Sequence, residues 1–409
     1  MEKLRRLFRG RIVLPDGVIE EGHVLCVGDR IASVGTGRGS AEADEIVEWA
    51  EGYVAPGYVD IHVHGGSGAD FMDGSESALT TVCQAHLRHG TTSLLATTCV
   101  AWKEQILTVL RLCQDYKNCP EKTGLRLLGV HFYGPYFAAE ARGCHPAKPL
   151  RPPLADAYAD YLAFADIIVT ASVAPELPGA EDFARACVQR GIRLNIGHSQ
   201  ATAEQVAAAI RWGARHVDHL FCAMSDKTKL RRLQPWPMRG GVLEAALLYD
   251  ELTTEVIADG VHLSADLLLL AWKCKGIHRL ALVTDCNRAL DMPDGKYVFG
   301  PLDGGEPFFV QGGVALTTDG QGLASSVRGM DWMVRTFQRL TGRPVWEVIR
   351  MATLTPAQII GHAYDLGSLE AGKLADIVLL DDKLHLQQVY VGGKLAWSAA
   401  ATALRPPTR

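Results

Sequence analysis

Between about residues 55 and 360, eight short apolar runs alternate with helix-like stretches, and this alternation constrains the fold of the chain most strongly. Each run has the length of a buried strand and ends in a polar cluster. The runs span residues 58–61, 93–96, 125–130, 167–173, 193–196, 216–218, 253–258 and 279–283, and helical spacers include 181–189, 203–212 and 265–273. Eight strand and helix repeats predict an α/β fold, a (β/α)8 TIM-like barrel.

Histidines and one aspartate stand where these predicted strands end. Alternate side chains of a strand point to the same face, so His62 and His64 leave the backbone about 7 Å apart, close enough to share one metal ion. His198, His219 and Asp285 follow the fifth, sixth and eighth runs. In a (β/α)8 barrel, active-site groups lie at the carboxyl ends of the strands. A doubly wound sheet, the alternative fold, would gather them at one switch point instead.

Composition narrows the class of protein. The chain has 409 residues, 48% of them hydrophobic, and a net charge of -5, which gives no electrostatic basis for binding nucleic acid or an anionic membrane. No run of eighteen apolar residues is present, and no apolar segment of the kind found in signal peptides follows the basic start. Ten scattered cysteines without a CxxC pair indicate reduced thiols. We therefore expect a cytoplasmic protein with neither nucleic acid nor membrane as a partner.

The two ends of the chain differ from the middle. Residues 9–54 and about 366–398 alternate apolar and polar positions between turn signals, which is typical of β-hairpins. Neither end has enough strands for a core of its own, so we expect both to pair in one small β-sandwich domain, made of residues 1–54 and 361–409. The barrel then occupies residues 55–360. The proline-rich stretch 138–153 is expected to be an irregular loop beside the site.

Ten short segments, in this order, resemble those of the amidohydrolase superfamily and, within it, of the N-acetylglucosamine-6-phosphate deacetylase family. They comprise residues 56–66, 90–93, 131–136, 143–146, 174–176, 197–199, 219–224, 257–262, 283–285 and 367–376. The resemblance covers essentially the whole chain. It implies hydrolysis of the acetamide of an N-acetylated amino sugar, N-acetylglucosamine 6-phosphate first among candidates, to the amino sugar phosphate and acetate.

Amide hydrolysis at neutral pH needs a hydroxide, which a divalent metal supplies by lowering the pKa of bound water to about 7. His198 and His219 suit metal binding as neutral imidazoles, and His62 and His64 form a second pair. Asp285 can contact both metal and water, so we expect it to act as general base and then as general acid to the departing amine. Zinc is the first choice of metal, with iron, manganese, cobalt and nickel as alternatives.

Further roles follow from the resemblance alone. It implies that His145 and His262 hold the acyl oxygen and a sugar hydroxyl. It also implies that the segment containing Cys222 and Ala223 meets the substrate's phosphate, although the family pattern has an asparagine at position 222.

Position 133 departs most from the family pattern, because Tyr133 replaces a glutamate metal ligand. A phenol with a pKa near 10 is a poorer ligand than a carboxylate and does not readily bridge two ions. We therefore expect about one ion per chain, held either by His62, His64 and Asp285 or by His198 and His219 with a water. Tyr133 is then expected to face the substrate.

The basic segment that follows position 226 is longer than the pattern and differs from it. Arg231, Arg232 and Arg239 are candidates for a phosphate contact, also across the interface of a homodimer. A solvated basic loop is an equally good reading.

Two other functions fit the same residues. A deacylase of another small N-acyl compound, such as an unphosphorylated amino sugar or an N-acyl amino acid, would use the same water and base without a phosphate site. A catalytically weak binding homologue would have lost activity together with the carboxylate at position 133.

Overall fold

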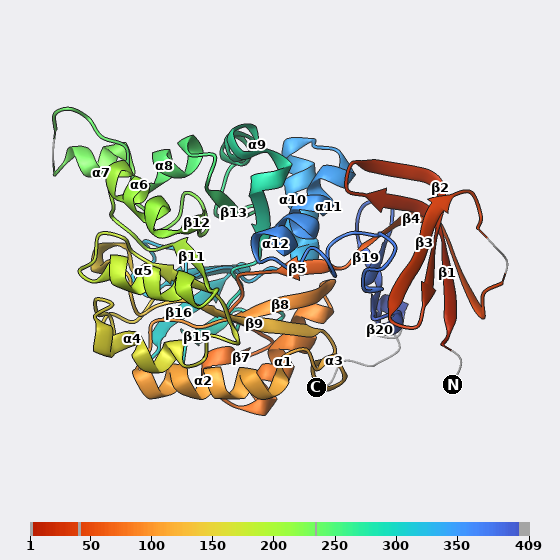
Figure 1. Ribbon diagram of the computed structural model, residues 1–409, viewed down its shortest axis with the longest axis horizontal. Coiled ribbons are helices and arrows are strands. Elements are labelled where there is room, and N and C mark those ends of the chain that lie inside the picture. The colour runs from red at the N-terminus through yellow and green to blue at the C-terminus, as the bar shows by residue number, and fades with distance from the viewer. Residues whose placement is uncertain (1–2, 40–41, 234, 401–409) are drawn as a thin grey trace.

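The computed structural model describes residues 3–39, 42–233 and 235–400 (Figure 1). Its largest sheet has eight parallel strands in the order β14-β13-β12-β11-β10-β9-β8-β5. The strands are β5 (Tyr58–Asp60), β8 (Thr91–Thr97), β9 (Arg126–Phe132), β10 (Ile168–Val173), β11 (Arg193–Ile196), β12 (Ala214–Val217), β13 (Thr253–Ile257) and β14 (Leu280–Val283). Each lies within two residues of one predicted run, so the alternation predicted all eight strands correctly.

Hydrogen bonds join the segments that follow the first and last strands of this sheet. The backbone N–H of Asp285 donates to the carbonyl of His62 (2.8 Å), and the N–H of His64 donates to the carbonyl of Cys286 (2.9 Å). Below them, the hydroxyl of Thr284 donates to Oδ2 of Asp60 (2.6 Å). The chain therefore brings the residues after β5 and β14 together, although they are more than 200 positions apart in the sequence.

Helices connect and cover the strands. They are α1 (Glu76–Leu87), α2 (Lys103–Tyr116), α3 (Pro120–Thr123), α4 (Ala155–Leu162), α5 (Ala180–Gln189), α6 (Ala203–Trp212), α7 (Lys227–Arg231), α8 (Val242–Leu248), α9 (Ala265–Arg279), α10 (Met330–Thr341), α11 (Val345–Ala352) and α12 (Leu354–Ile359). Short 3-10 turns are η1 (Phe71–Asp73) and η2 (Ala139–Ala141). None of the helices in the described ranges is both long and apolar enough to cross a membrane.

Local sequence explains where helix α6 begins and ends. Thr202 caps its first turn, and Gln205 reaches back to the cap, forming a capping box. The helix ends at Gly213, whose φ of 114° is in the left-handed region that favours glycine. Its bounds match the prediction, whereas α9 runs six residues beyond its predicted end, past a kink at Gly276.

The two ends of the chain pair in a second sheet, which lies at one end of the molecule in Figure 1. Its seven strands are β20 (Lys394–Ser398), β19 (Leu386–Val391), β18 (Ile377–Leu380), β4 (Glu45–Pro56), β1 (Arg5–Leu14), β2 (Gly17–Val27) and β3 (Arg30–Thr36), in that order. Strand β4 joins the two halves, since it pairs with β1 and also with β18. Phe8, Val24, Ile377 and Tyr390 share a separate small core there. The predicted pairing of both ends is therefore observed.

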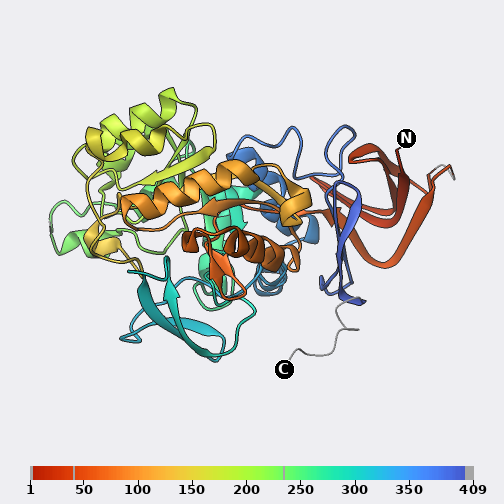
Figure 2. The same ribbon diagram turned by 90° about the horizontal axis from the view of Figure 1, so that it is seen from below.

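A third sheet, β15 (Gly295–Phe299), β16 (Glu306–Gln311) and β17 (Val314–Thr317), was not predicted. In Figure 2 these strands, coloured cyan, stand at the edge of the body. They are short and half-exposed, so they lack the continuous apolar runs that reveal the parallel strands. A two-stranded ribbon, β6 (Gly65–Gly66) with β7 (Ala69–Asp70), follows the predicted metal-binding pair.

Candidate active site

The predicted ligands come from the turns directly after strands β5, β11, β12 and β14. His198, His219 and Asp285 have positive φ angles of 47°, 21° and 44°. Such backbone conformations cost a residue other than glycine about 1 kcal/mol or more and are concentrated at functional sites. The fold therefore holds three of the five predicted ligands in strained turns at one edge of the sheet.

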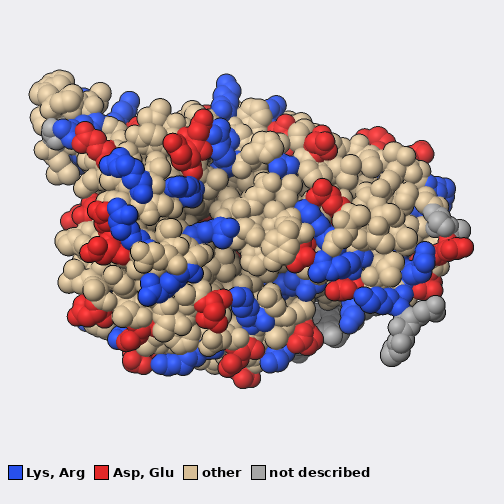
Figure 3. Space-filling model, viewed as in Figure 1, with Lys and Arg blue, Asp and Glu red and all other residues tan. Residues whose placement is uncertain are grey.

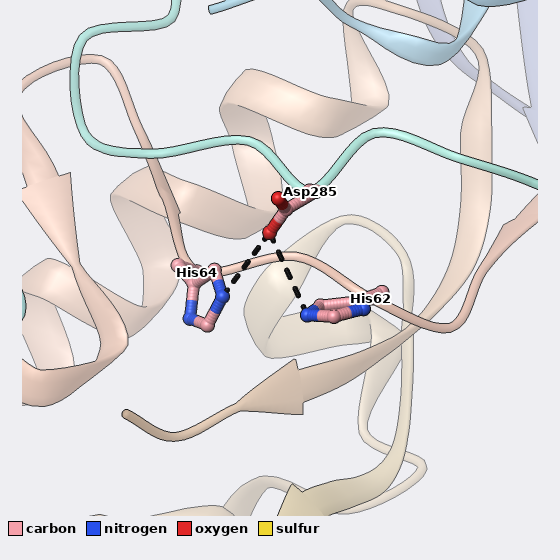
Figure 4. Close-up of side chains that lie close together, drawn as sticks. All are labelled: His62, His64 and Asp285. Atoms are coloured by element: carbon pink, nitrogen blue, oxygen red, sulfur yellow. Dashed lines mark ion pairs between the residues drawn. The ribbon is translucent and has the colours of Figure 1, made fainter. Parts of the chain in front are cut away.

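His62, His64 and Asp285 form a compact group of donors (Figure 4). Oδ1 of Asp285 lies 3.3 Å from Nε2 of His64 and 3.5 Å from Nε2 of His62. Ligands about 2.0–2.1 Å from a tetrahedral zinc lie about 3.3–3.4 Å from one another. Nε2 of His62 is also buried without a hydrogen-bond partner among the described residues. The spacing, the donor types and this unpartnered nitrogen all fit a bound divalent cation.

The charges around His62 favour a cation in the same place. Its Nδ1 lies 2.5 Å from Oε1 of the buried Glu255. Burial alone would lower the pKa of His62, but the carboxylates of Glu255 and Asp285 raise it to about 9. Burial alone would raise the pKa of Asp285, but His62 and His64 hold it below its ordinary value. His62 and His216 likewise hold the pKa of Glu255 well below its ordinary value against the effect of burial, so both carboxylates are ionised at neutral pH.

The second predicted pair has different surroundings. Nδ1 of His198 donates to the carbonyl of Ala141 (2.7 Å), and its Nε2 lies 3.2 Å from Nε2 of His219. The hydroxyl of Tyr133 lies 2.6 Å from that same nitrogen of His219. Burial lowers the pKa of His219 to about 4 and raises the pKa of Tyr133 above its ordinary value, so both are neutral. A neutral phenol thus occupies a position from which a carboxylate ligand could act.

A cavity of about 340 Å³ opens over these groups. Nine of the eleven predicted site residues line it: His64, Tyr133, His145, His198, His219, Cys222, Ala223, His262 and Asp285. His62 is fully buried next to them. Arg231 is not in the lining; it is exposed, and its guanidinium lies 5.8 Å from the ring centre of Trp236. Lys229, two positions earlier, lines the cavity instead.

The two remaining histidines are fixed through their Nδ1 atoms. Nδ1 of His145 accepts a hydrogen bond from the backbone N–H of Val100 (3.3 Å), which places its proton on Nε2. Nδ1 of His262 is 2.8 Å from Oδ2 of Asp259 and donates to it. Each ring therefore keeps its Nε2 for a ligand.

Sequence reasoning missed several side chains close to the site. Glu255, Asp218 and His131 are buried among the strands around His62. Phe299 and Ser325 reach the cavity from the unpredicted third sheet and the loop after it. A carboxylate inside the predicted strand 253–258 was the one signal in the sequence that pointed to Glu255.

Similarity to known proteins extends over most of the chain. Residues 53–396 match the model of the amidohydrolase family. An N-acetylglucosamine-6-phosphate deacetylase from Vibrio furnissii is 33% identical over 348 residues, covering 85% of this chain and 84% of the relative. An N-acetylgalactosamine-6-phosphate deacetylase from Escherichia coli O157:H7 is 36% identical over 346 residues, covering 84% and 87%.

Solved structures agree with these relatives. An N-acetyl-D-glucosamine-6-phosphate deacetylase from Mycobacterium smegmatis, solved in complex with N-acetyl-D-glucosamine-6-phosphate, superposes with a TM-score of 0.87 at 27% identity. The match covers 97% of this chain and 100% of that one. The chain belongs to the amidohydrolase family and, within it, to the family of N-acetylglucosamine-6-phosphate deacetylases.

Proposed function

We propose that this protein is a metal-dependent deacetylase that hydrolyses the acetamide of N-acetylglucosamine 6-phosphate to the amino sugar phosphate and acetate. The observation that carries this proposal is the position of Asp285, which lies between two buried histidines at a cavity also lined by His145 and His262. The similarity to deacetylases of amino sugar 6-phosphates along most of the chain supports the substrate class.

The proposed metal ligands are His62, His64 and Asp285, with about one ion per chain. Zinc is the first choice, and iron, manganese, cobalt and nickel suit the same nitrogen and oxygen donors. A divalent ion there would supply Lewis-acid activation of the attacking water at neutral pH. His198 and His219 are proposed to act beside this site, in contact with Tyr133.

The side chains then divide the proton transfers between them. Asp285, ionised at neutral pH, takes a proton from the water while the water oxygen attacks the acyl carbon. The same carboxyl gives that proton to the sugar nitrogen as the C–N bond breaks, which releases acetate and the amine. His145 donates a hydrogen bond from Nε2 to the acyl oxygen, where negative charge develops. His262, held by Asp259, binds a sugar hydroxyl.

The phosphate is proposed to bind near Cys222 and Ala223, where Lys229 is the nearest basic side chain of the cavity. Arg231 remains a candidate if a second subunit brings it to the site. A homodimer is supported by the projection that follows α7, where Leu233, Trp236 and Met238 are 81%, 74% and 53% exposed. Figure 3 shows mostly uncharged surface at this projection, in its upper left corner.

A second function is favoured by the charges of the cavity. Lys229 is the only lysine or arginine among its described lining residues, and Glu140 also lines it. An anionic phosphate gains little from such a balanced pair, whereas a neutral N-acetylated sugar or a small N-acyl compound does not need a phosphate site. A deacylase of these compounds is therefore the alternative.

We further propose that the parallel sheet closes into a (β/α)8 barrel over residues 55–360, which the hydrogen bonds between the segments after β5 and β14 support. The seven-stranded sheet is proposed to fold into a β-sandwich domain of residues 1–54 and 361–409. The cytoplasmic location remains a prediction from the sequence.

One experiment separates these functions. The protein, purified with zinc, is analysed for metal content and assayed for acetate release from N-acetylglucosamine 6-phosphate, N-acetylgalactosamine 6-phosphate, N-acetylglucosamine and N-acetyl amino acids. We expect about one metal ion per chain and the highest kcat/KM on a phosphorylated amino sugar. The variant Asp285→Asn serves as the inactive control. A preference for unphosphorylated compounds would favour the alternative, and bound metal without any acetate release would contradict both.

A further inference from the structure

Glu255 is a fully buried carboxylate that the proposed reaction does not use. It lies in the middle of strand β13, between Thr254 and Val256, with 1% of its surface exposed. We infer that Glu255 is a positioning residue, which orients His62 as a metal ligand and holds it in the form that binds the ion. This inference rests on the metal site proposed above.

Three hydrogen bonds fix the carboxylate of Glu255. Its Oε1 accepts from Nδ1 of His62 (2.5 Å) and from the backbone N–H of His219 (3.2 Å), and its Oε2 lies 3.1 Å from Nε2 of His216. These donors come from two places in the fold: His62 follows β5, whereas His216 lies in β12 and His219 follows it. The carboxylate therefore has one defined orientation, and so does the imidazole that it binds.

This contact decides which nitrogen of His62 is available to a metal. An ionised carboxylate only accepts hydrogen bonds, so Nδ1 of His62 keeps its proton, and the proton that a metal ion displaces from this ring is the one on Nε2. Nε2 is the nitrogen that has no partner and lies 3.5 Å from Asp285. A carboxylate behind a histidine ligand also makes the ligand more basic, and loss of such a partner typically lowers metal affinity about 10–100-fold.

The second histidine of the group lacks this support. Nδ1 of His64 is buried without a hydrogen-bond partner among the described residues, and the carboxylate in contact with this ring, Asp285, lies on the side of Nε2, 3.3 Å away. His62 is thus the anchored histidine of the pair, and Glu255 is the group that anchors it.

A direct role of Glu255 as a ligand fits the contacts less well. Glu255, Asp218 and His62 also lie close enough together to hold an ion. However, Oδ2 of Asp218 accepts from the hydroxyl of Ser172 (2.5 Å), and its Oδ1 accepts from the amide of Asn195 (2.9 Å). Both carboxylates are therefore already occupied by protein donors, and an ion there would have to displace them.

The test compares the zinc affinity of the wild type with that of Glu255→Gln, measured by competition with a chromophoric chelator. Glutamine keeps the size of the side chain and removes its charge. Asp218→Asn is the matched control, since it neutralises an equally buried carboxylate that is not hydrogen-bonded to a proposed ligand. We expect Glu255→Gln to weaken zinc binding about 10–100-fold and Asp218→Asn to change it less than about threefold. Equal effects of the two variants, or no effect of Glu255→Gln, would overturn the inference.

A second set of variants tests the inference in case Glu255→Gln by itself folds poorly. If Glu255 acts through His62, Glu255→Gln has no further effect on affinity once His62 is replaced by asparagine, and Glu255→Asp retains part of the wild-type affinity. The same loss from Glu255→Gln in the His62→Asn background as in the wild type would overturn the inference. A wild-type protein that binds no zinc would contradict the proposed metal site itself, which distinguishes the two failures.

Discussion

The hydroxyl of Tyr133 lies 2.6 Å from Nε2 of His219, and we predict that it keeps an ion away from the pair formed by His198 and His219. Two substitutions test this. Tyr133→Phe removes only the hydroxyl, because the ring keeps its packing against Phe137, 4.7 Å away between ring centres. Tyr133→Glu places a carboxylate close to two neutral imidazoles, and the three groups together form a set of ligands suited to zinc.

The structure sets the size of the expected effects. Tyr133→Phe removes one fully buried hydrogen bond, but His219 keeps its contact with His198, so the unfolding free energy of the metal-free protein should fall by about 1–2 kcal/mol. Tyr133→Glu should raise the metal content from about one ion per chain toward two. Zinc at 100 times its dissociation constant would then stabilise the variant by about 3 kcal/mol more than the wild type, which has no second site.

Turnover is expected to move in the opposite direction. Tyr133 lines the cavity as a neutral donor, and a glutamate would place a negative charge where negative charge also develops on the acyl oxygen. Metal content by elemental analysis, thermal unfolding with and without zinc, and acetate release are measured on the same preparations. More metal together with equal or greater turnover would refute the role of Tyr133 in the pocket, and an unchanged metal content would refute the idea that it blocks a second site.

The remaining predictions concern the base, the ligands and pH. Asp285→Asn should keep the fold and much of the substrate affinity but lower kcat about a hundredfold or more, so normal turnover would contradict its role as base. His64→Ala should lower metal content more than His198→Ala. The reverse order would indicate that the ion binds to His198 and His219 instead. Outside the site, burial would lower the pKa of His89, but two adjacent aspartates raise it to about 9. Protonated His89 therefore contributes about 3 kcal/mol of stability, fully present below pH about 6.5 and lost as the pH rises through 9, and His89→Gln should abolish this loss in pH-dependent unfolding.

The sequence predicted those features that depend on local periodicity. A buried parallel strand is a short apolar run between helices, so all eight strands were found within two residues. The ligands could be placed because residues at the carboxyl ends of parallel strands meet at one edge of a sheet. Strands β15–β17 escaped because short, half-exposed strands have no such run, and they add Phe299 to the cavity.

Contacts between distant side chains could not be predicted in the same way. Glu255 and His62 are 193 positions apart, and nothing in the run 253–258 says which strand end its glutamate will face. The contact of Tyr133 with His219 depends on how two turns after different strands are oriented relative to each other. The sequence therefore indicated which residues surround the site, whereas their pairing required the structure.

That pairing places carboxylates of the described residues in contact with the rings of His62 and His64 but not with those of His198 and His219, and this difference favours one location for the ion. Nδ1 of His62 is hydrogen-bonded to the ionised Glu255, and Asp285 lies within 3.5 Å of Nε2 of both His62 and His64. Neither ring of the other pair is hydrogen-bonded to a carboxylate in the part of the chain that the structure describes; the polar partners of those rings are a backbone carbonyl, the phenol and each other. A divalent cation leaves water more readily where protein charges compensate the lost hydration. The pair without such charges would need the glutamate that Tyr133 replaces, and so metal occupancy should depend on His64 rather than on His198.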